Sequence, residues 1–141
     1  MVSIEANKAV VRRLWNEVWN QNNLAVADEI FDAPYAAHER TFVPVIRAAF
    51  PDSHHTIEEM IADGDQVVTR FTWTGTHRGA FLGIAATDRP IRVGGIWIHR
   101  LANGRIVEGR EWGCLDWPGL LQQLGAAISG PAGAAKDIPS P

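Results

Sequence analysis

Hydrophobic residues in the first part of the chain recur with a helical spacing. Between positions 4 and 20, apolar side chains return every three or four residues with charged side chains between them, which predicts an amphipathic helix. The polar run at positions 21–23 ends this pattern. Residues 24–31 predict a second, shorter helix that ends before Pro34, because the residue preceding a proline disfavours the helical conformation.

Prolines divide the segment that follows. Residues 34–40 are interpreted as a turn or a short strand, and residues 41–50 predict a helix that starts after Pro44. Pro51 and Asp52 end this helix. The predicted helices, except one at the end of the domain, therefore all precede the first predicted strand.

After residue 53 the pattern changes to the alternation of β-strands. Residues 54–77 predict two strands joined by a turn at Gly64. A loop punctuated by Gly and Pro follows. Residues 91–101 and 105–117 predict two further strands, joined by a hairpin turn at Asn103-Gly104.

Helices followed by antiparallel strands indicate an α+β fold. A curved sheet with helices on one face can enclose a cavity, and such cavities commonly bind small molecules. A short helix over residues 118–124, ended by Gly125, closes a domain that we predict at residues 1–125. Residues 126–141 are rich in Ala, Gly and Pro and lack a core pattern, which predicts a flexible tail.

Composition argues against several classes of protein. The chain has 141 residues, which suits one domain, and its hydrophobic content of 46% is typical of a globular protein. Its net charge is −3 and it has no run of Lys or Arg, so nucleic-acid binding is not expected. No apolar run approaches the roughly 20 residues of a membrane helix. The single Cys114 excludes an internal disulfide and, together with an N-terminus unlike a secretory signal, predicts a cytoplasmic protein.

The strongest candidate for chemistry is Glu111 on the last predicted strand. Because side chains alternate along a strand, Glu111 shares a face with Val107, Gly109, Gly113 and Leu115, an apolar surface with free space beside the glycines. A carboxyl group on such a surface is harder to ionise than in water, which suits a general acid or base near neutral pH. The alternative is a structural carboxylate that pairs with an arginine or points to solvent.

Two further residues near this strand have alternative interpretations. Asp116 can cap the following helix by accepting its free N–H groups, which is the favoured role, or serve as a second candidate acid. On the preceding strand, His99 shares a face with Trp97, and it can polarise a carbonyl group or relay a proton to Glu111. A hydrogen-bonded histidine in the core or at its rim is an equally good interpretation of His99.

Aromatic residues are candidates for the wall of a substrate pocket. Tryptophan often lines pockets, which makes Trp97 one of these candidates. Phe71 and Trp73 share one strand face, which lines either the pocket or an interface with a second subunit. Trp15 and Tyr35 complete the candidate substrate-binding residues.

The other histidines do not suggest a metal site. His54 and His55 are adjacent on a strand and point to opposite faces, so they cannot bind one ion together. No spacing of His, Glu and Cys matches a metal motif, and no G-x-S-x-G or G-x-G-x-x-G motif supports nucleophilic hydrolysis or dinucleotide binding. His77 is a candidate for a structural hydrogen bond to the loop that follows it. We therefore expect neither a metal nor a cofactor.

Residues 5–125 resemble the SnoaL-like polyketide cyclases, a family within the nuclear transport factor 2-like superfamily. The resemblance rests on "FPD" at 50–52, "GTHRGAFLGI" at 75–84, the hairpin around Asn103-Gly104 and "GLLQQLG" at 119–125. It implies a cone-shaped barrel in which a strongly bent antiparallel sheet wraps around a long N-terminal helix. It also implies a deep internal pocket and a homodimer formed through the outer face of the sheet.

The resemblance further implies a mechanism. Cyclases of the family use a carboxylate on the last strand as general acid/base, without metal or cofactor. Glu111 occupies the matching position, where the cyclases have Asp, and Asp116 lies where many members also carry Asp. His38 lies where many members have a histidine near the pocket mouth, which makes it a candidate for the cavity wall. The segment between His38 and Phe50 is several residues shorter than is usual in the family, which predicts a cavity mouth that is more open or is shaped by a partner subunit.

The sequence therefore predicts cofactor-free proton transfer on a small hydrophobic carbonyl or epoxide compound. In this hypothesis Glu111 transfers the proton, and His99 or His38 holds the carbonyl oxygen so that an enolate-like charge is stabilised. Aldol-type ring closure is the best-known use of such a site in the family, and isomerisation, dehydration, epoxide opening or hydroxylation would need similar groups. The alternative from another class is a non-catalytic binding or assembly module with the same fold.

Overall fold

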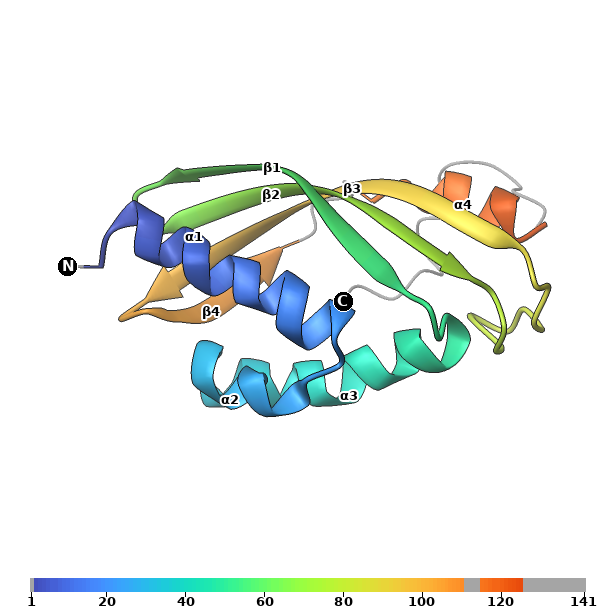
Figure 1. Cartoon of the computed structure of the whole chain (residues 1–141), viewed down its shortest axis with the longest axis horizontal. Helices are drawn as coiled ribbons and strands as arrows, with labels where there is room; N and C mark the ends of the chain where they lie inside the picture. The colour runs from blue at the N-terminus through green and yellow to red at the C-terminus, as the bar shows by residue number, and fades with distance from the viewer. Residues whose placement is uncertain (1, 111–114, 126–141) are drawn as a thin grey trace.

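The computed structural model describes residues 2–110 and 115–125 (Figure 1). Helix α1 (Ile4–Arg13) continues into the π-helical segment η1 (Leu14–Asn20), and the short segments η2 (Leu24–Val26) and α2 (Ala27–Ile30) lead to α3 (Ala33–Ala49). Strands β1 (His54–Asp63), β2 (Gln66–Thr76), β3 (Pro90–Ala102) and β4 (Arg105–Arg110) follow, and then α4 (Trp117–Gln123). This order of elements confirms the predicted α+β class.

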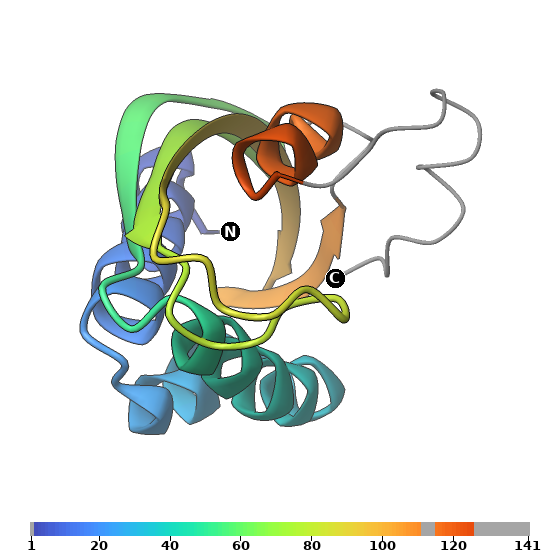
Figure 2. The ribbon, with the colours of Figure 1, turned by 90° about the vertical axis from the view of Figure 1, so that its right-hand side faces the viewer.

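The strands form one antiparallel sheet in the order β1-β2-β3-β4. Figure 2 shows the sheet bent into an open ring, with α3 lying across the side that the strands leave open. Along β3, every second residue from Ile91 to Leu101 is buried, and the residues between them are more exposed. This inner face includes Trp97 and His99, as strand alternation predicts.

The N-terminal helix packs against the inner side of the sheet, as Figure 1 shows for α1 below β1 and β2. The helix begins at Ser3, whose Oγ accepts a hydrogen bond from the N–H of Ala6 at 3.1 Å and so caps the first turn. Its apolar stripe continues without a break from α1 into η1: Val11 of α1 and Trp15 and Val18 of η1 are at most 2% exposed. The prediction of one long amphipathic helix over residues 4–20 is confirmed.

The prediction for residues 34–40 is wrong, because this segment is helical. It belongs to α3, which runs through Pro44 without a break. Pro34 lies in the first turn, where its missing N–H costs nothing, and Asp32 Oδ1 caps the helix by accepting from the N–H of Tyr35 at 3.1 Å. Pro44 lies on the exposed side of the helix. The side that packs against the domain carries a stripe at helical spacing: Ala36, Glu39, Val43, Ile46 and Ala49.

Both predicted hairpins are confirmed by the strand pairing. Gly64 has φ 58°, and Asn103 and Gly104 have φ 53° and 77°, the left-handed conformation that tight hairpin turns require. Helix α4 begins at Trp117, one residue before the predicted start. Residues 111–114 and 126–141 lie outside the described residues, so the end of the last strand and the flexible tail stay predictions.

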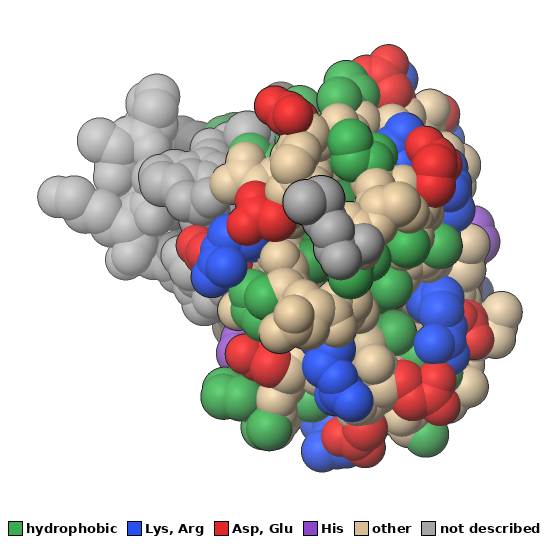
Figure 3. Space-filling view, turned by 90° about the vertical axis from the view of Figure 1, so that its left-hand side faces the viewer, with side chains coloured by type: hydrophobic (Ala, Val, Ile, Leu, Met, Phe, Trp, Pro, Cys, Tyr) green, Lys and Arg blue, Asp and Glu red, His purple; other side chains and the backbone are tan. Residues whose placement is uncertain are grey.

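Charges of both signs are interspersed on the surface. Figure 3 shows one face on which basic and acidic side chains lie next to one another rather than in separate areas. Arg13, for example, pairs with Glu17 at 2.6 Å and with Glu29 at 2.8 Å. None of the helices in the described part of the chain is long and apolar enough to cross a membrane.

Candidate functional site

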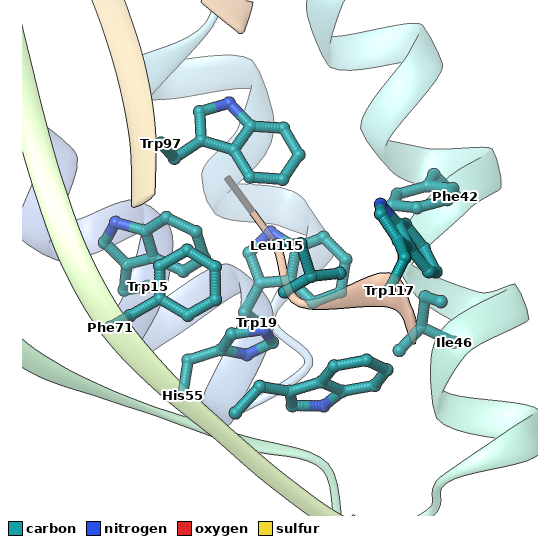
Figure 4. A pocket seen from close by; sticks show the side chains of 10 residues that line it. Trp15, Trp19, Phe42, Ile46, His55, Phe71, Trp97, Leu115 and Trp117 are labelled. Carbon is teal, nitrogen blue, oxygen red and sulfur yellow. The ribbon is translucent and has the colours of Figure 1, made fainter. Parts of the chain in front are cut away.

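An apolar cavity lies between the inner face of the sheet and the helical side of the domain (Figure 4). Its free volume is about 40 Å³, which is room for only a few water molecules. From the sheet, His55 of β1, Phe71 and Trp73 of β2 and Trp97 of β3 form its wall. A ligand larger than a few waters therefore needs wall side chains to move.

The helical wall is built by η1, α3 and Trp117 of α4, and Leu115 lines the cavity next to Trp117. Trp15 and Trp19 are four residues apart on η1 and both face the cavity, and Phe42 and Ile46 face it from α3. Trp15 lies at the centre of the aromatic cluster, with its ring centroid 4.8 Å from that of Phe71. π-Helical segments are uncommon and frequently occur at functional sites, so the placement of two wall residues on η1 agrees with a site here.

The structure places four of the predicted aromatic residues in this wall: Trp15, Phe71, Trp73 and Trp97. Trp73 is held in position by its Nε1–H, which donates to Ser53 Oγ at 2.8 Å. Tyr35 does not line the cavity. It lies on α3 and stacks on Phe31, with ring centroids 4.6 Å apart.

Two buried histidines face the interior of the domain. His55 lines the cavity, and His99 lies behind Trp97, with the two rings stacked at 5.9 Å. Burial lowers the pKa of both imidazoles to about 3, so both are neutral at physiological pH. As sequence alternation predicts, His54 next to His55 is exposed. His99 is placed one layer behind the cavity wall rather than in it.

Several buried polar atoms of this region have no hydrogen-bond partner among the described residues. They include Nε1 of Trp15 and Trp97, and Nδ1 of His55 and His99. Buried polar atoms are usually satisfied, and leaving one unpaired costs roughly 1–3 kcal/mol. Trp15 and His55 are also wall residues, so a ligand in the cavity can supply their missing partners.

A buried carboxyl group that the sequence interpretation missed lies on α3. Glu39 is only 3% exposed, and its Oε2 has no partner among the described residues. Burial raises the pKa of Glu39 to about 8. The sequence signal for Glu39 is its position in the otherwise apolar helical stripe of α3. The interpretation of residues 34–40 as a turn or strand hides this spacing.

His38 is not in the cavity wall. Its side chain is 47% exposed, and its ring stacks on Phe42 with centroids 5.7 Å apart. Its Nδ1 lies 3.9 Å from Oε1 of Glu39. His38 is therefore placed between solvent and a buried carboxyl group rather than next to a ligand in the cavity.

Asp116 caps helix α4. Its Oδ1 accepts a hydrogen bond from the N–H of Gly119 at 3.0 Å, and the residue is exposed. This is the favoured one of the two roles that the sequence suggested. The position also leaves Asp116 outside the wall of the cavity.

We expect Asp116→Ala to lower the free energy of unfolding by about 1 kcal/mol, because the N–H of Gly119 in the first turn of α4 loses its acceptor. Asp116→Asn retains an acceptor oxygen and should cost less than half as much. Chemical denaturation of both variants measures the difference. Equal losses for Ala and Asn would show that the charge, and not the cap, is what stabilises this end of the domain.

The remaining candidates have clear positions. Nδ1 of His77 lies 3.0 Å from Oγ1 of Thr87, which agrees with a structural role toward the following loop. Glu111 and Cys114 lie outside the described residues. Gly109, two residues before Glu111, pairs with His99 and so belongs to the inner face of the sheet. Among the residues that the structure describes, no group of His, Cys, Asp or Glu side chains could hold a metal ion.

Comparison with known proteins adds a family to this geometry. A model of the SnoaL-like polyketide cyclase family matches residues 9–124. A comparison with curated proteins finds no match.

Solved structures of other proteins share the fold. TsrD from Streptomyces laurentii has a TM-score of 0.82 at 22% identity, covering 90% of this chain and 100% of that chain. IdmH from Streptomyces antibioticus, assigned as a polyketide cyclase, has a TM-score of 0.72 at 26% identity, covering 85% and 99%. AclR from Streptomyces galilaeus, assigned as a hydroxylase, has a TM-score of 0.77 at 23% identity, covering 87% and 98%.

Proposed function

Because the chain belongs to the SnoaL-like polyketide cyclase family, we propose that it is a cofactor-independent acid/base enzyme for a small hydrophobic carbonyl compound. The substrate binds in the aromatic cavity, and the reaction is an aldol-type cyclisation, an isomerisation or a dehydration. IdmH is assigned as a polyketide cyclase, which favours ring closure. AclR is assigned as a hydroxylase, so hydroxylation is the second candidate reaction on this fold.

The observation that carries the proposal is the unpaired polar nitrogen atoms in an otherwise apolar wall. Nε1–H of Trp15 can only donate a hydrogen bond, and it has no acceptor among the described residues; Nδ1 of His55 also has no partner there. A carbonyl oxygen is the acceptor that such donors lack. In a site shielded from water, donors aimed at an oxygen stabilise the negative charge that develops on it when a neighbouring C–H bond is broken.

The proposed base is Glu111. Gly109 belongs to the inner face of the sheet, and strand alternation predicts the same side for Glu111. In the proposed step the carboxylate of Glu111 takes the proton from the carbon next to the carbonyl group. The electron pair of that C–H bond moves toward the carbonyl oxygen and forms the enolate, which then attacks an electrophile within the substrate or is protonated at another carbon.

Deuterium exchange tests this function without knowledge of the natural substrate. The protein is incubated with 2-tetralone in D₂O in the presence of a chelator, and loss of the α-proton signals is followed by NMR. We expect exchange faster than in buffer alone and independent of the chelator. Binding of 2-tetralone without faster exchange would support the alternative, a non-catalytic binding module, and a product that forms only with O₂ would support hydroxylation.

The predicted homodimer belongs to the same proposal. A partner subunit on the outer face of the sheet leaves the inner face, where the cavity lies, available to the ligand. Sedimentation of the full chain measures the assembly directly, and a single monomeric species at all concentrations would contradict a dimer.

A further inference from the structure

A second polar site lies next to the cavity on α3. Glu39 is one helical turn before Phe42, which lines the cavity, and it belongs to the inward stripe of α3 that also carries the wall residue Ile46. Its carboxyl group is almost fully buried, and Oε2 has no partner among the described residues. A buried oxygen atom with no partner is costly, so this position calls for a ligand group.

Tyr35 lies one turn before Glu39 on the same helix, and its hydroxyl group reaches the inner face of the sheet. A Cβ atom at Gly109 would overlap this hydroxyl oxygen and lie 2.8 Å from Nε1 of Trp97. The absence of a side chain at position 109 is therefore what allows the Tyr35 hydroxyl and the Trp97 nitrogen to come together.

Trp97 links this site to the cavity. Its ring is part of the cavity wall, and Figure 4 shows it at one end of the cavity with the ring nitrogen directed away from the other aromatic side chains. The nitrogen lies near the Tyr35 hydroxyl and forms no well-defined hydrogen bond in this structure. Tyr35 and Glu39 thus lie beyond the Trp97 end of the cavity.

We propose that Tyr35 and Glu39 form an oxygen-binding site at the Trp97 end of the cavity, in which both side chains donate hydrogen bonds to the carbonyl oxygen of the ligand. The inference rests on the proposed function for the class of ligand, a small apolar carbonyl compound. It assigns the orientation of that ligand: the oxygen points toward α3, and the hydrocarbon part lies among the aromatic rings. The ligand reaches the site by displacing the ring of Trp97.

The charge states of the two groups agree with a donor role. Burial raises the pKa of Glu39 to about 8, so at pH 7 the group is mainly a carboxylic acid with a proton to donate. Burial, with a smaller contribution from Glu39, raises the pKa of Tyr35 as well. The exposed His38, with Nδ1 3.9 Å from Oε1 of Glu39, gives the buried acid a route to exchange its proton with water.

Two carboxylates on the elements packed against α3 form ion pairs away from Glu39. On α2, Asp28 pairs with Arg40 at the surface. On β4, Glu108 pairs with Arg100 at 3.1 Å, on the outer side of the sheet. Tyr35 and His38 are titratable groups that interact with Glu39, and neither is a fixed positive charge that neutralises it.

The site is tested by comparing the binding of two small probes that differ only in whether they carry a carbonyl oxygen. Acetophenone carries a carbonyl oxygen, and α-methylstyrene has a CH₂ group in its place with nearly the same shape. Dissociation constants of both are measured at pH 6.5 from the shifts of the Trp indole N–H signals in NMR. The ratio of the two dissociation constants is compared between variants, because the difference in hydrophobicity between the two probes is the same for every variant and cancels.

The expected result separates two variants of one residue. Glu39→Leu removes the donor and keeps an apolar side chain of similar size in a buried stripe, so acetophenone should lose about tenfold in affinity relative to α-methylstyrene. Glu39→Gln retains an N–H donor and should leave the ratio within about twofold. Circular dichroism checks that both variants are folded, and a ratio unchanged in folded Glu39→Leu would overturn the proposal.

A pH titration gives an independent readout. In the wild type the preference for acetophenone should decrease as pH rises from 7 to 9, because the carboxylate form of Glu39 no longer donates. Glu39→Gln should show no such change. If α-methylstyrene also fails to bind, the aromatic cavity and with it the proposed function are wrong. If both probes bind but the ratio of their dissociation constants changes neither in the Glu39 variants nor with pH, only the oxygen-binding site is wrong.

Discussion

Glu111→Gln is expected to slow the α-proton exchange of 2-tetralone by about 10²–10⁴-fold, the usual contribution of a positioned general base. Gln has nearly the size of Glu but cannot accept a proton at neutral pH. The affinity for 2-tetralone should stay within about twofold, because the aromatic wall supplies most of the binding. A loss confined to the rate and absent from binding is the signature of a group that acts in the transition state.

Glu108→Gln is the matched control for this experiment. Glu108 is a carboxylate of the same region of the chain, but it pairs with Arg100 on the outer side of the sheet. Its removal should leave the exchange rate within about twofold, since a half-exposed ion pair contributes little to stability. An equal loss of rate in both variants would point to a change in the sheet rather than to catalysis. Unchanged exchange in Glu111→Gln would remove Glu111 from the mechanism.

The sequence predicts the fold well where one periodicity runs without interruption. Residues 4–20 carry a helical stripe, and β3 alternates between buried and exposed positions from Ile91 to Leu101, so the long helix and the inner face of the sheet follow from the pattern. Residues 34–40 were missed because prolines suggested a break. Pro34 is tolerated because it lies in the first turn of α3, and Pro44 lies on the exposed side of the helix. Whether a proline is tolerated therefore depends on where the helix begins and which side it exposes.

Some features of the site follow from patterns of neighbouring residues, and others depend on contacts between segments far apart in the sequence. Strand alternation places Phe71, Trp73 and Trp97 on the inner face, which is local information. The meeting of Tyr35 with Gly109 joins segments far apart in the sequence, so no local pattern could predict it. Glu39 lies between these cases. Once α3 is known to be helical, a carboxylate in its buried stripe is a signal for function that can be read directly from the sequence.

The free energy of unfolding is expected to have a maximum near pH 6.5 and to decrease on both sides. Below this pH, His55 and His99 cause the decrease. Both are neutral in the folded protein, with pKa lowered to about 3, but in the unfolded chain they bind protons at the ordinary value of 6.5. The unfolded state therefore gains two protons as pH falls, which lowers the free energy of unfolding by about 2.7 kcal/mol per pH unit for the pair.

Glu39 acts in the opposite direction. Its pKa is raised from 4.5 to about 8, so between these values the folded state holds a proton that the unfolded state has released. Stability from this group is complete below pH 4.5 and is lost as pH rises toward 8, by about 1.4 kcal/mol per pH unit. Between pH 4.5 and 6.5 the net decrease on acidification is thus about 1.4 kcal/mol per unit. From pH 6.5 to 8 the decrease on raising pH has the same size.

Denaturant unfolding at several pH values, in the wild type and in variants, separates the two contributions. In Glu39→Gln the curve should become flat above pH 6.5, and its acid side should steepen to about 2.7 kcal/mol per unit. In the double variant His55→Phe/His99→Phe the slope between pH 4.5 and 6.5 should reverse, so that the protein becomes more stable as pH falls. Slopes rather than absolute values are compared, because Phe also changes the packing. An unreversed acid slope in the folded double variant would mean that the two histidines are not the groups that take up protons on unfolding.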